Sequence, residues 1–399
     1  MSIIVQKFGG TSVSSVESRQ LCANKIIKQI NLGNKVVAVV SAMGRKGEPY
    51  ATDTLLNLVK DKDVTERDKD LLMSCGELIS SVVIASMLNT LGYKACAVTG
   101  YQAGIITNSD NGSAMCECID CSYIKSLLEK NIIPIVTGFQ GIHNGIEITT
   151  LGRGGSDTSA ALLAAALKAD RVDIFTDVDG IMTADPRIVK DAKVIEAMHA
   201  TEVLQMAQQG AKVIHPRAVE ATLRGEVDMF IKNTYNEEDG TKITYDLAVN
   251  ETRNNDSVIT SIASMRNRAQ IVINKIEENE DSIILNEMAK KGISIDLINI
   301  FVNRFVFTID VHDVKKAKKI LDKKNLDYDI IDNLCKVTAI GTKMHGVPGV
   351  MAKIVTALLE AECEILQSAD SHMHISCLVK VEDEYKAVNA LHKAFQLSE

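Results

Sequence analysis

The sequence contains no tryptophan, only 5 prolines, and few other aromatic residues, with 8 phenylalanines and 8 tyrosines among 399 residues. Its core must be built mainly from aliphatic side chains, and these are plentiful, because 46% of the residues are hydrophobic. A chain of this length and composition buries enough apolar surface for two or three domains. Disorder is excluded for most of the length.

Long apolar runs and a signal sequence are also missing. The longest uncharged apolar run in a predicted helix, residues 160–167, is far shorter than the ~18 residues that a membrane span needs. Residues 1–10 lack the charged start and long apolar segment of a signal peptide. The 9 cysteines, an odd number, fit a reducing compartment better than a disulfide framework. We therefore expect a cytoplasmic protein that does not contact a membrane.

The chain also lacks any long block of positive charge. It has 44 Lys and Arg against 52 Asp and Glu, a net charge of −8. This balance argues against nucleic acid as a partner. An anionic ligand would need local cations and backbone N–H groups to overcome the overall negative field.

The first ~255 residues alternate apolar β-type runs with helical patterns, which is typical of a mainly parallel sheet covered by helices. We expect strands at 3–5, 36–40, 95–98, 132–136 and 172–176, and helices at 16–30, 66–91 and 156–167. The predicted class is α/β, and ligands in such sheets bind where strands end.

The C-terminal part repeats itself after the polar stretch 233–256. A shift of 70 positions aligns Ile284 with Ile354, and the apolar residues of the following predicted helices and strands keep step. Two β-α-β-β-α units are therefore expected. We expect domains at 1–255, 256–334 and 335–399, with a strand near 258–263 completing the second unit.

The first motif that indicates chemistry is SIIVQKFGGTSV at 2–13, a strand followed by Lys7, the paired glycines Gly9 and Gly10, and Thr11. Paired glycines let the backbone approach phosphate oxygens, their N–H groups can form an anion-binding nest, and Lys7 adds a full charge. The order differs from that of a Walker A loop. Taken alone, the motif would be better explained as a tight turn.

The second motif is TLGRGGSDTS at 150–159. Arg153 can bind a carboxylate with two hydrogen bonds, while Ser156 and the first amides of the following helix can hold an anion. Capping of that helix by Ser156 or Asp157 is the simpler alternative, and the two are compatible.

The third motif, TDVDGIMTADPR at 176–187, follows a strand and ends at an X-Pro break. Asp177 and Asp179 suggest calcium, but the glycine and the final acid of an EF-hand are out of place. A nucleotide-contacting loop remains, with Arg187 available for phosphates, and a solvated turn is the alternative. Lys212 is either a second phosphate cation or an exposed lysine.

Three further residues can orient a small amino acid: Ser41, Thr52 and Glu77. The two hydroxyls suit a carboxylate and Glu77 suits an ammonium group, although Glu77 could equally lie on a helix surface.

Cysteines and histidines provide two weaker candidates. Cys116, Cys118 and Cys121 have near-ligand spacing for zinc, but no fourth ligand lies nearby, so we interpret them as a thiol-bearing loop. His372 and His374 are expected to alternate on a strand.

Six motifs follow one another along the chain: KFGGTSV (7–13), SAMG (41–44), CGE (75–77), GRGGSD (152–157), FTDVDGIMTADPR (175–187) and GAKVIHPRA (210–218). In this order they resemble the motifs of aspartate kinases. The tandem C-terminal units look like ACT domains, so the resemblance covers essentially the whole chain. Residues 45–53 and 346–372 look most like the diaminopimelate-sensitive aspartokinase I group.

The resemblance implies an amino-acid-kinase fold that transfers the γ-phosphoryl of ATP to the β-carboxylate of aspartate, with Mg²⁺ held mainly by phosphates and water. A carboxylate is ionised near pH 7 and needs no general base, so positioning and charge neutralisation remain to be supplied. The implied catalytic residues are Lys7, Lys212 and Asp157. The implied nucleotide residues are Lys7, Gly9, Gly10, Thr11, Asp177, Met182, Arg187 and Lys212, with Met182 replacing a Tyr of many relatives. The implied aspartate residues are Ser41, Thr52, Glu77, Arg153 and Ser156.

Two alternatives stay open at this point, namely another carboxylate kinase of the same fold and a non-catalytic amino-acid sensor. Because the chain ends after the second ACT-like unit, we expect no homoserine dehydrogenase module.

The ACT-like units imply an amino-acid effector and assembly into a homodimer or a dimer of dimers. We expect meso-diaminopimelate as inhibitor, with lysine second and threonine third. The residues assigned to the effector are Gly346, Val347, Gly349, Val350, Ser294 and Asp296.

Overall fold

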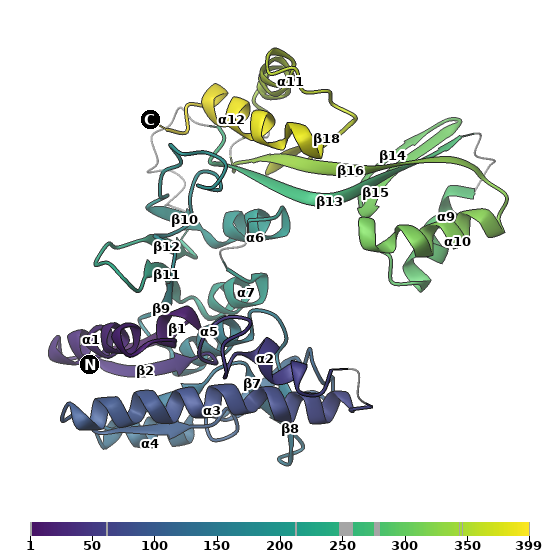
Figure 1. Cartoon of the computed structure of the whole chain (residues 1–399). Helices are drawn as coiled ribbons and strands as arrows, with labels where there is room; N and C mark the ends of the chain where they lie inside the picture. Colours follow the sequence, from purple (N-terminus) through teal and green to yellow (C-terminus); the bar gives the residue numbers. More distant parts are fainter. Residues whose placement is uncertain are drawn as a thin grey trace. The chain divides into compact units, whose positions relative to one another are not determined.

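A computed structural model describes residues 2–60, 63–211, 214–246, 258–274, 280–342, 344 and 346–398. The chain forms two compact units (Figure 1). The first unit comprises Met1–Ile181, Val194–Ala207 and Lys212–Arg253, and the second comprises Met182–Lys193, Gln208–Ala211 and Asn254–Glu399. The domain boundary expected near residue 255 lies outside the described residues and stays a prediction.

The first unit is built on an eight-stranded sheet in the order β10-β12-β11-β9-β1-β2-β6-β3. Its neighbouring strands are parallel except for the β11–β12 pair. The strands are β1 (Ile3–Phe8), β2 (Lys35–Val40), β3 (Ala95–Val98), β6 (Ile133–Thr137), β9 (Arg171–Thr176), β10 (Ala197–His199), β11 (Asp228–Asn233) and β12 (Thr241–Thr244).

Helices cover this sheet. Buried residues of α1 and α3 share a core with β1, β2 and β6, whereas α5 contacts β1, β9 and α7. The helices are α1 (Val16–Asn31), α2 (Thr52–Asn57), α3 (Glu66–Thr90), α4 (Ser122–Glu129), α5 (Gly155–Leu167), α6 (Ala200–Gln208) and α7 (Pro216–Gly225). The strands and helices expected from the sequence are confirmed to within a few residues at each end.

A four-stranded sheet in the order β5-β4-β7-β8 belongs to the same unit and was not expected. Cys116 and Cys118 lie in its strand β5, so the prediction of a loop at these cysteines is wrong. The strands are β4 (Ile105–Thr107), β5 (Cys116–Ile119), β7 (Gln140–His143) and β8 (Glu147–Thr150).

The second unit contains a six-stranded antiparallel sheet in the order β14-β15-β13-β16-β18-β17. The long strands β13 and β16 run side by side through it (Figure 1). The strand β18 begins at His374, so His372 lies before the strand and does not alternate with it. The elements are β13 (Ser261–Asn274), α9 (Glu280–Lys290), β14 (Ile295–Phe301), β15 (Arg304–Asp310), α10 (Val314–Lys323), β16 (Asp327–Ile340), α11 (Val350–Glu360), β17 (Gln367–Asp370), β18 (His374–Lys380) and α12 (Glu384–Ala394).

The two halves of this unit have equivalent cores, as the sequence repeat predicted. Helices α9 and α10 pack on one part of the sheet, and α11 and α12 pack on the other. Residues 70 positions apart occupy corresponding buried places in the two cores: Ile284 and Ile354, Met288 and Leu358, Ile309 and Val379, Ala317 and Ala387, Leu321 and Leu391.

The core of the second half also includes the segment Met182–Lys193, which the chain reaches between β9 and β10. Ala184 and Val189 are buried in this core, and the Thr183 hydroxyl is hydrogen-bonded to His392 Nε2 at 2.9 Å. Burial lowers the pKa of His392, which favours its neutral form. Residues 182–187, the last part of the nucleotide loop expected at 176–187, are therefore part of the second unit.

Helix α3 is long and apolar enough to cross a membrane when only length and composition are considered. Its apolar residues do not form one long run in the sequence, because Glu77 and four serines interrupt them. In the structure, 44% of its most apolar window is buried within the protein, and the helix contacts β3, β6 and β8. These contacts are those of a core helix.

Candidate functional site

A pocket of about 460 Å³ lies in the first unit, where β1, β2 and β6 end and α5 begins. This is the carboxyl edge of a parallel sheet, the usual ligand site in such folds. The pocket collects charged, hydroxyl and glycine residues from segments far apart in the sequence. Its lining comprises Lys7, Gly10, Ser41, Ala42, Gly44, Thr52, Met73, Glu77, Gly112, Phe139, Gly152, Arg153, Gly154, Gly155, Ser156 and Asp157.

Lys7 and Asp157 form an ion pair inside this pocket. The distance from Lys7 Nζ to Asp157 Oδ1 is 2.6 Å, and the two side chains are only 10% and 16% exposed. Lys7 is the fifth residue of β1 and Asp157 lies in the first turn of α5, so the sheet and the helix hold the charges together. A buried cation at a helix N-terminus is suited to an anionic ligand.

Position 10 requires a glycine, because the backbone of Ala42 and Gly44 approaches it closely. A Cβ atom there would lie 2.7 Å from the Gly44 carbonyl oxygen and 2.8 Å from that of Ala42. The Gly9 N–H donates to the Phe175 carbonyl oxygen at 3.2 Å. The assignment of Gly9 and Gly10 to the phosphates stays a prediction.

Glu77 is 2% exposed and lines the pocket from α3. The Ala42 N–H donates to its Oε1 at 3.1 Å, while its Oε2 is buried without a hydrogen-bond partner. Burial raises the pKa of Glu77 to about 8, and contacts with backbone N–H groups and with the Gln140 side chain only partly offset this. The possibility of a helix-surface glutamate is thus excluded. The unpartnered oxygen can accept a hydrogen bond from a ligand.

The loop before α5 brings Arg153 and Ser156 to the same pocket. Gly154 precedes the helix with φ of 65°, a left-handed conformation in which a side chain would also meet His215. Arg153 is exposed at the pocket and Ser156 is 8% exposed. The loop therefore offers a guanidinium, a hydroxyl and a helix start to one ligand.

Of the remaining predicted nucleotide residues, those that the structure describes do not line this pocket. Thr11 begins a short 3-10 helix, and its carbonyl oxygen accepts from the Tyr235 hydroxyl at 3.0 Å. Asp177 forms an ion pair with Arg45, a partner that the sequence analysis missed. Met182 and Arg187 belong to the second unit, where Arg187 pairs with Asp185, and Lys212 lies outside the described residues. Their nucleotide roles stay predictions.

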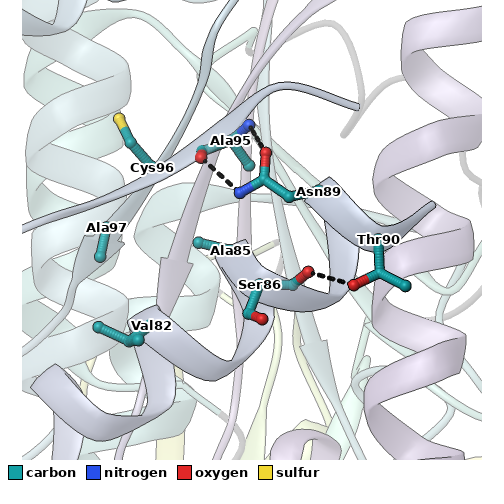
Figure 2. Close-up of a pocket in the computed structure, with 8 residues that line it drawn as sticks. All are labelled: Val82, Ala85, Ser86, Asn89, Thr90, Ala95, Cys96 and Ala97. Atoms are coloured by element: carbon teal, nitrogen blue, oxygen red, sulfur yellow. Dashed lines mark hydrogen bonds between the residues drawn. The ribbon is translucent and has the colours of Figure 1, made fainter. Parts of the chain in front are cut away.

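A second hollow of about 570 Å³ lies where the end of α3 meets β3 (Figure 2). Asn89 holds this region together, because its Nδ2 donates to the Ala95 carbonyl oxygen at 2.9 Å and its Oδ1 accepts from the Ala95 N–H at 3.0 Å. The lining residues carry no charge, which makes the hollow unsuitable for phosphates. They are Val82, Ala85, Ser86, Asn89, Thr90, Ala95, Cys96 and Ala97.

A metal centre built only from protein side chains is not found in the described part of the chain. There, no three His, Cys, Asp or Glu side chains are grouped so that they could hold an ion. Any Mg²⁺ would therefore need ligands from phosphates and water as well.

The residues assigned to an effector lie in the second unit. Gly346, Val347 and Gly349 are exposed in the turn before α11, but Val350 is buried in the core and can offer only its backbone. Ser294 is exposed, and Asp296 forms an ion pair with Lys336. Residues at surface positions thus occur in both segments assigned to the effector, 294–296 and 346–350, and the identity of the effector stays a prediction.

The comparisons with known proteins agree with this architecture. The amino acid kinase family model matches residues 2–233, and an ACT domain model matches residues 329–393. Aspartokinase 1 of Bacillus subtilis (strain 168) is 46% identical over 403 residues, covering 100% of both chains. This chain belongs to the aspartokinase family.

Solved aspartokinase structures show the same fold. E. coli aspartokinase III in complex with aspartate and ADP (R-state) superposes with a TM-score of 0.79 at 25% identity, covering 98% of this chain and 99% of the other. The same enzyme in complex with lysine and aspartate (T-state) gives 0.75 at 25% identity and the same coverage. The protein is therefore a carboxyl-group phosphotransferase that uses ATP and carries ACT units, and a non-catalytic sensor is no longer an alternative.

Proposed function

We propose that this aspartokinase transfers the γ-phosphoryl of ATP to the β-carboxylate of L-aspartate in the pocket that contains Lys7 and Glu77. The products are ADP and 4-phospho-L-aspartate, at the entry to the biosynthesis of lysine, diaminopimelate, threonine and methionine. The observation that carries the proposal is the unpartnered Glu77 Oε2, buried beside cations and hydroxyls in one pocket. An α-ammonium group completes the hydrogen bonding of that oxygen.

The other aspartate contacts follow from charge. Arg153 and the hydroxyls of Ser41, Thr52 and Ser156 bind carboxylate oxygens, because all four residues line the pocket. The aspartate β-carboxylate is the nucleophile and is already ionised, so no side chain has to remove a proton.

The cationic side of the pocket stabilises charge on the transferring group. Lys7 Nζ lies 2.6 Å from Asp157 and can also bind a phosphoryl oxygen, and Gly10 and the start of α5 provide backbone N–H groups. We assign Lys212 a similar role from the sequence motif alone. Mg²⁺ neutralises phosphate charge when bound. The partly buried Asp157 carboxylate can contact water molecules bound to the Mg²⁺ ion.

A direct test is aspartate-dependent trapping of the acyl phosphate as its hydroxamate, with ATP and Mg²⁺. Activity with aspartate that greatly exceeds activity with glutamate or N-acetylglutamate would support the proposal. A preference for another carboxylate would contradict the substrate assignment and leave the phosphotransferase class intact.

We further propose feedback inhibition by meso-diaminopimelate, with lysine second and threonine third. The support is the resemblance of residues 45–53 and 346–372 to the diaminopimelate-sensitive group, together with the exposed turn before α11. A doubly charged amino acid suits backbone N–H groups at one end and a carboxylate at the other. The Asp296 carboxylate would be shared with Lys336. Separate titration of the three amino acids decides the ranking, and inhibition by lysine alone would reverse it.

We propose a homodimer formed through the second unit. Its edge strand β14 and the following turn expose Ile298, Ile300, Phe301 and Val302 with exposures of 40%, 57%, 55% and 102%. Exposed apolar edge strands invite pairing with another chain. Light scattering should show a dimer that Ile300→Glu converts to a monomer, and a wild-type monomer at micromolar concentration would contradict the proposal. The cytoplasmic location likewise stays a proposal.

A further inference from the structure

Asp70 is a fully buried carboxylate that the roles assigned above do not use. It lies in α3, 7 residues before Glu77, a spacing that places both on one face of the helix. No salt bridge to Asp70 is present among the described residues. Its charge is balanced instead by neutral hydrogen-bond donors.

These donors come from two separate loops of the first unit. From the first loop, Asn111 Nδ2 donates at 2.9 Å and the Gly112 N–H at 3.0 Å, both to Oδ2. From the end of β8, the Thr150 N–H donates to Oδ2 at 3.1 Å and the Thr150 hydroxyl to Oδ1 at 2.5 Å. The carboxylate therefore joins the Gly112 loop to the segment that continues into Arg153.

Both of these segments form walls of the ligand pocket. Gly112 and Arg153 line it, and so does Glu77 on the same helix as Asp70. A Cβ atom at Gly152 would lie 3.2 Å from the Gly112 carbonyl oxygen, so the two loops are in close contact. Asp70 therefore connects α3, which also carries Glu77, with the two loops that contribute Gly112 and Arg153 to the pocket lining.

Arg217 holds the same two loops from α7. Its Nη1 donates to the Leu151 carbonyl oxygen at 3.0 Å, and its Nη2 donates to the Ser113 hydroxyl at 3.4 Å. Asp70 contacts Gly112 and Thr150, and Arg217 contacts Ser113 and Leu151. Both residues therefore link the same two loops. Neither Asp70 nor Arg217 lines the pocket.

We propose that Asp70 is a positioning residue for aspartate: it holds the Gly112 and Thr150 loops together and so sets the place of Arg153 relative to Glu77. The inference rests on the proposed function, because it takes Arg153 and Glu77 as the aspartate contacts. It concerns the amino-acid side of the pocket, since the nucleotide side contains Lys7 and the strand ends. Loss of Asp70 should therefore affect the two substrates unequally.

The principal test is Asp70→Asn, measured as separate KM values for aspartate and ATP in the hydroxamate assay. Both carboxylate oxygens accept from N–H groups, so either orientation of the amide places its NH₂ against a donor. We expect the aspartate KM to rise by roughly tenfold or more, with the ATP KM within about twofold of wild type. Equal changes in both KM values, or no change in either, would overturn the proposal.

Asp173→Asn is the matched control. Asp173 is also a buried aspartate of the first unit, 1% exposed, but its partners are Arg171 on the same strand, β9, and Lys232 on the neighbouring strand β11, away from the pocket lining. The Asp173→Asn protein can lose stability without a change in the ratio of the aspartate KM to the ATP KM. A purely structural role for Asp70 predicts that Asp70→Asn behaves in the same way.

Thr150→Val keeps the test decisive if Asp70→Asn does not fold. It removes only the hydroxyl donor and keeps the backbone contact, so a smaller rise in the aspartate KM is expected, in the same direction. Arg217→Lys should show the same direction, and wild-type aspartate KM values in both variants would overturn the proposal. If the wild-type enzyme does not phosphorylate aspartate at all, the proposed function fails first, which is a distinguishable result.

Discussion

Glu77 and Glu384 are two buried glutamates, one in each unit, with exposures of 2% and 3%. Glu384 is fully paired, because its Oε1 accepts from the Ser264 hydroxyl at 2.7 Å and its Oε2 binds Arg266. Glu77 has one hydrogen bond and one unpartnered oxygen, and burial raises its pKa to about 8. A buried carboxyl group with complete pairing has no free atom for a ligand, whereas one with an unpartnered oxygen beside a pocket indicates a place for a ligand.

The largest effect is expected at the cation of the pocket. Lys7→Ala should reduce turnover by a hundredfold or more with the fold intact, since a donor aimed at a transferring phosphoryl contributes ~3 kcal/mol. The measurement is kcat together with a thermal unfolding curve.

Lys25→Ala is the control for Lys7. The two lysine side chains are equally buried, at 10% exposure, but Lys25 pairs with Glu237 and does not line the pocket. We expect near-normal turnover from this variant. A folded Lys7→Ala enzyme with wild-type turnover would contradict the assigned site.

The two glutamates provide the second prediction directly. Glu77→Gln should raise the aspartate KM by about ten- to a hundredfold, because an ammonium loses its charged partner, and the free energy of unfolding should not fall. Glu384→Gln should keep both KM values and lower the free energy of unfolding by about 1 kcal/mol, a modest figure because Arg266 is largely exposed. Steady-state kinetics and urea unfolding measure both quantities. The reverse pattern would show that Glu384, and not Glu77, faces a ligand.

Arg153 is expected to have a smaller effect, because its side chain is exposed at the pocket. Arg153→Ala should raise the aspartate KM by about tenfold and leave the ATP KM nearly unchanged, since a carboxylate contact acts on one substrate. A rise confined to the ATP KM would mean that the substrate and nucleotide roles are exchanged.

Much of the fold could be predicted from the sequence because its signals are local. Buried parallel strands such as β1 and β2 are continuous apolar runs, and the repeated cores of the second unit follow from apolar residues 70 positions apart. The four-stranded sheet was missed because its strands have only 3 or 4 residues and include polar ones. The sequence does not indicate that residues 182–187, the end of the expected nucleotide loop, belong to the second unit, because their packing partners lie about 200 positions away, as the Thr183–His392 pair shows.

The pocket residues were suggested by glycine-rich motifs at strand ends, but the supporting groups were not. Asp70 lies in the charged run ERDKD and resembles any residue of a helix start until its four donors are seen. Its spacing of 7 from Glu77, which places both residues on one face of α3, was the only available signal. Arg45 gave none, because its contact with Asp177 depends on the tertiary structure.

The smallest predicted effect is the pH dependence that distinguishes Glu77 from a paired glutamate. Because the pKa of Glu77 is about 8, the carboxylate is mostly protonated at pH 7 and mostly ionised at pH 9. If the ionised form binds the ammonium group, the aspartate KM should fall by up to about tenfold between these pH values. Glu77→Gln should remove this part of the pH profile, whereas Glu384→Gln should retain it.

The same pKa has an opposite consequence for stability in the absence of aspartate. The ordinary glutamate pKa is 4.5, so between about pH 4.5 and 8 the folded protein keeps a proton that the unfolded chain has lost. Unfolding then releases a proton, and the free energy of unfolding falls as the pH rises through this window. Glu77→Gln should flatten that decline in urea unfolding curves measured at several pH values. If the wild-type and Glu77→Gln curves have the same slope, the Glu77 pKa is not raised, and the KM prediction loses its physical basis as well.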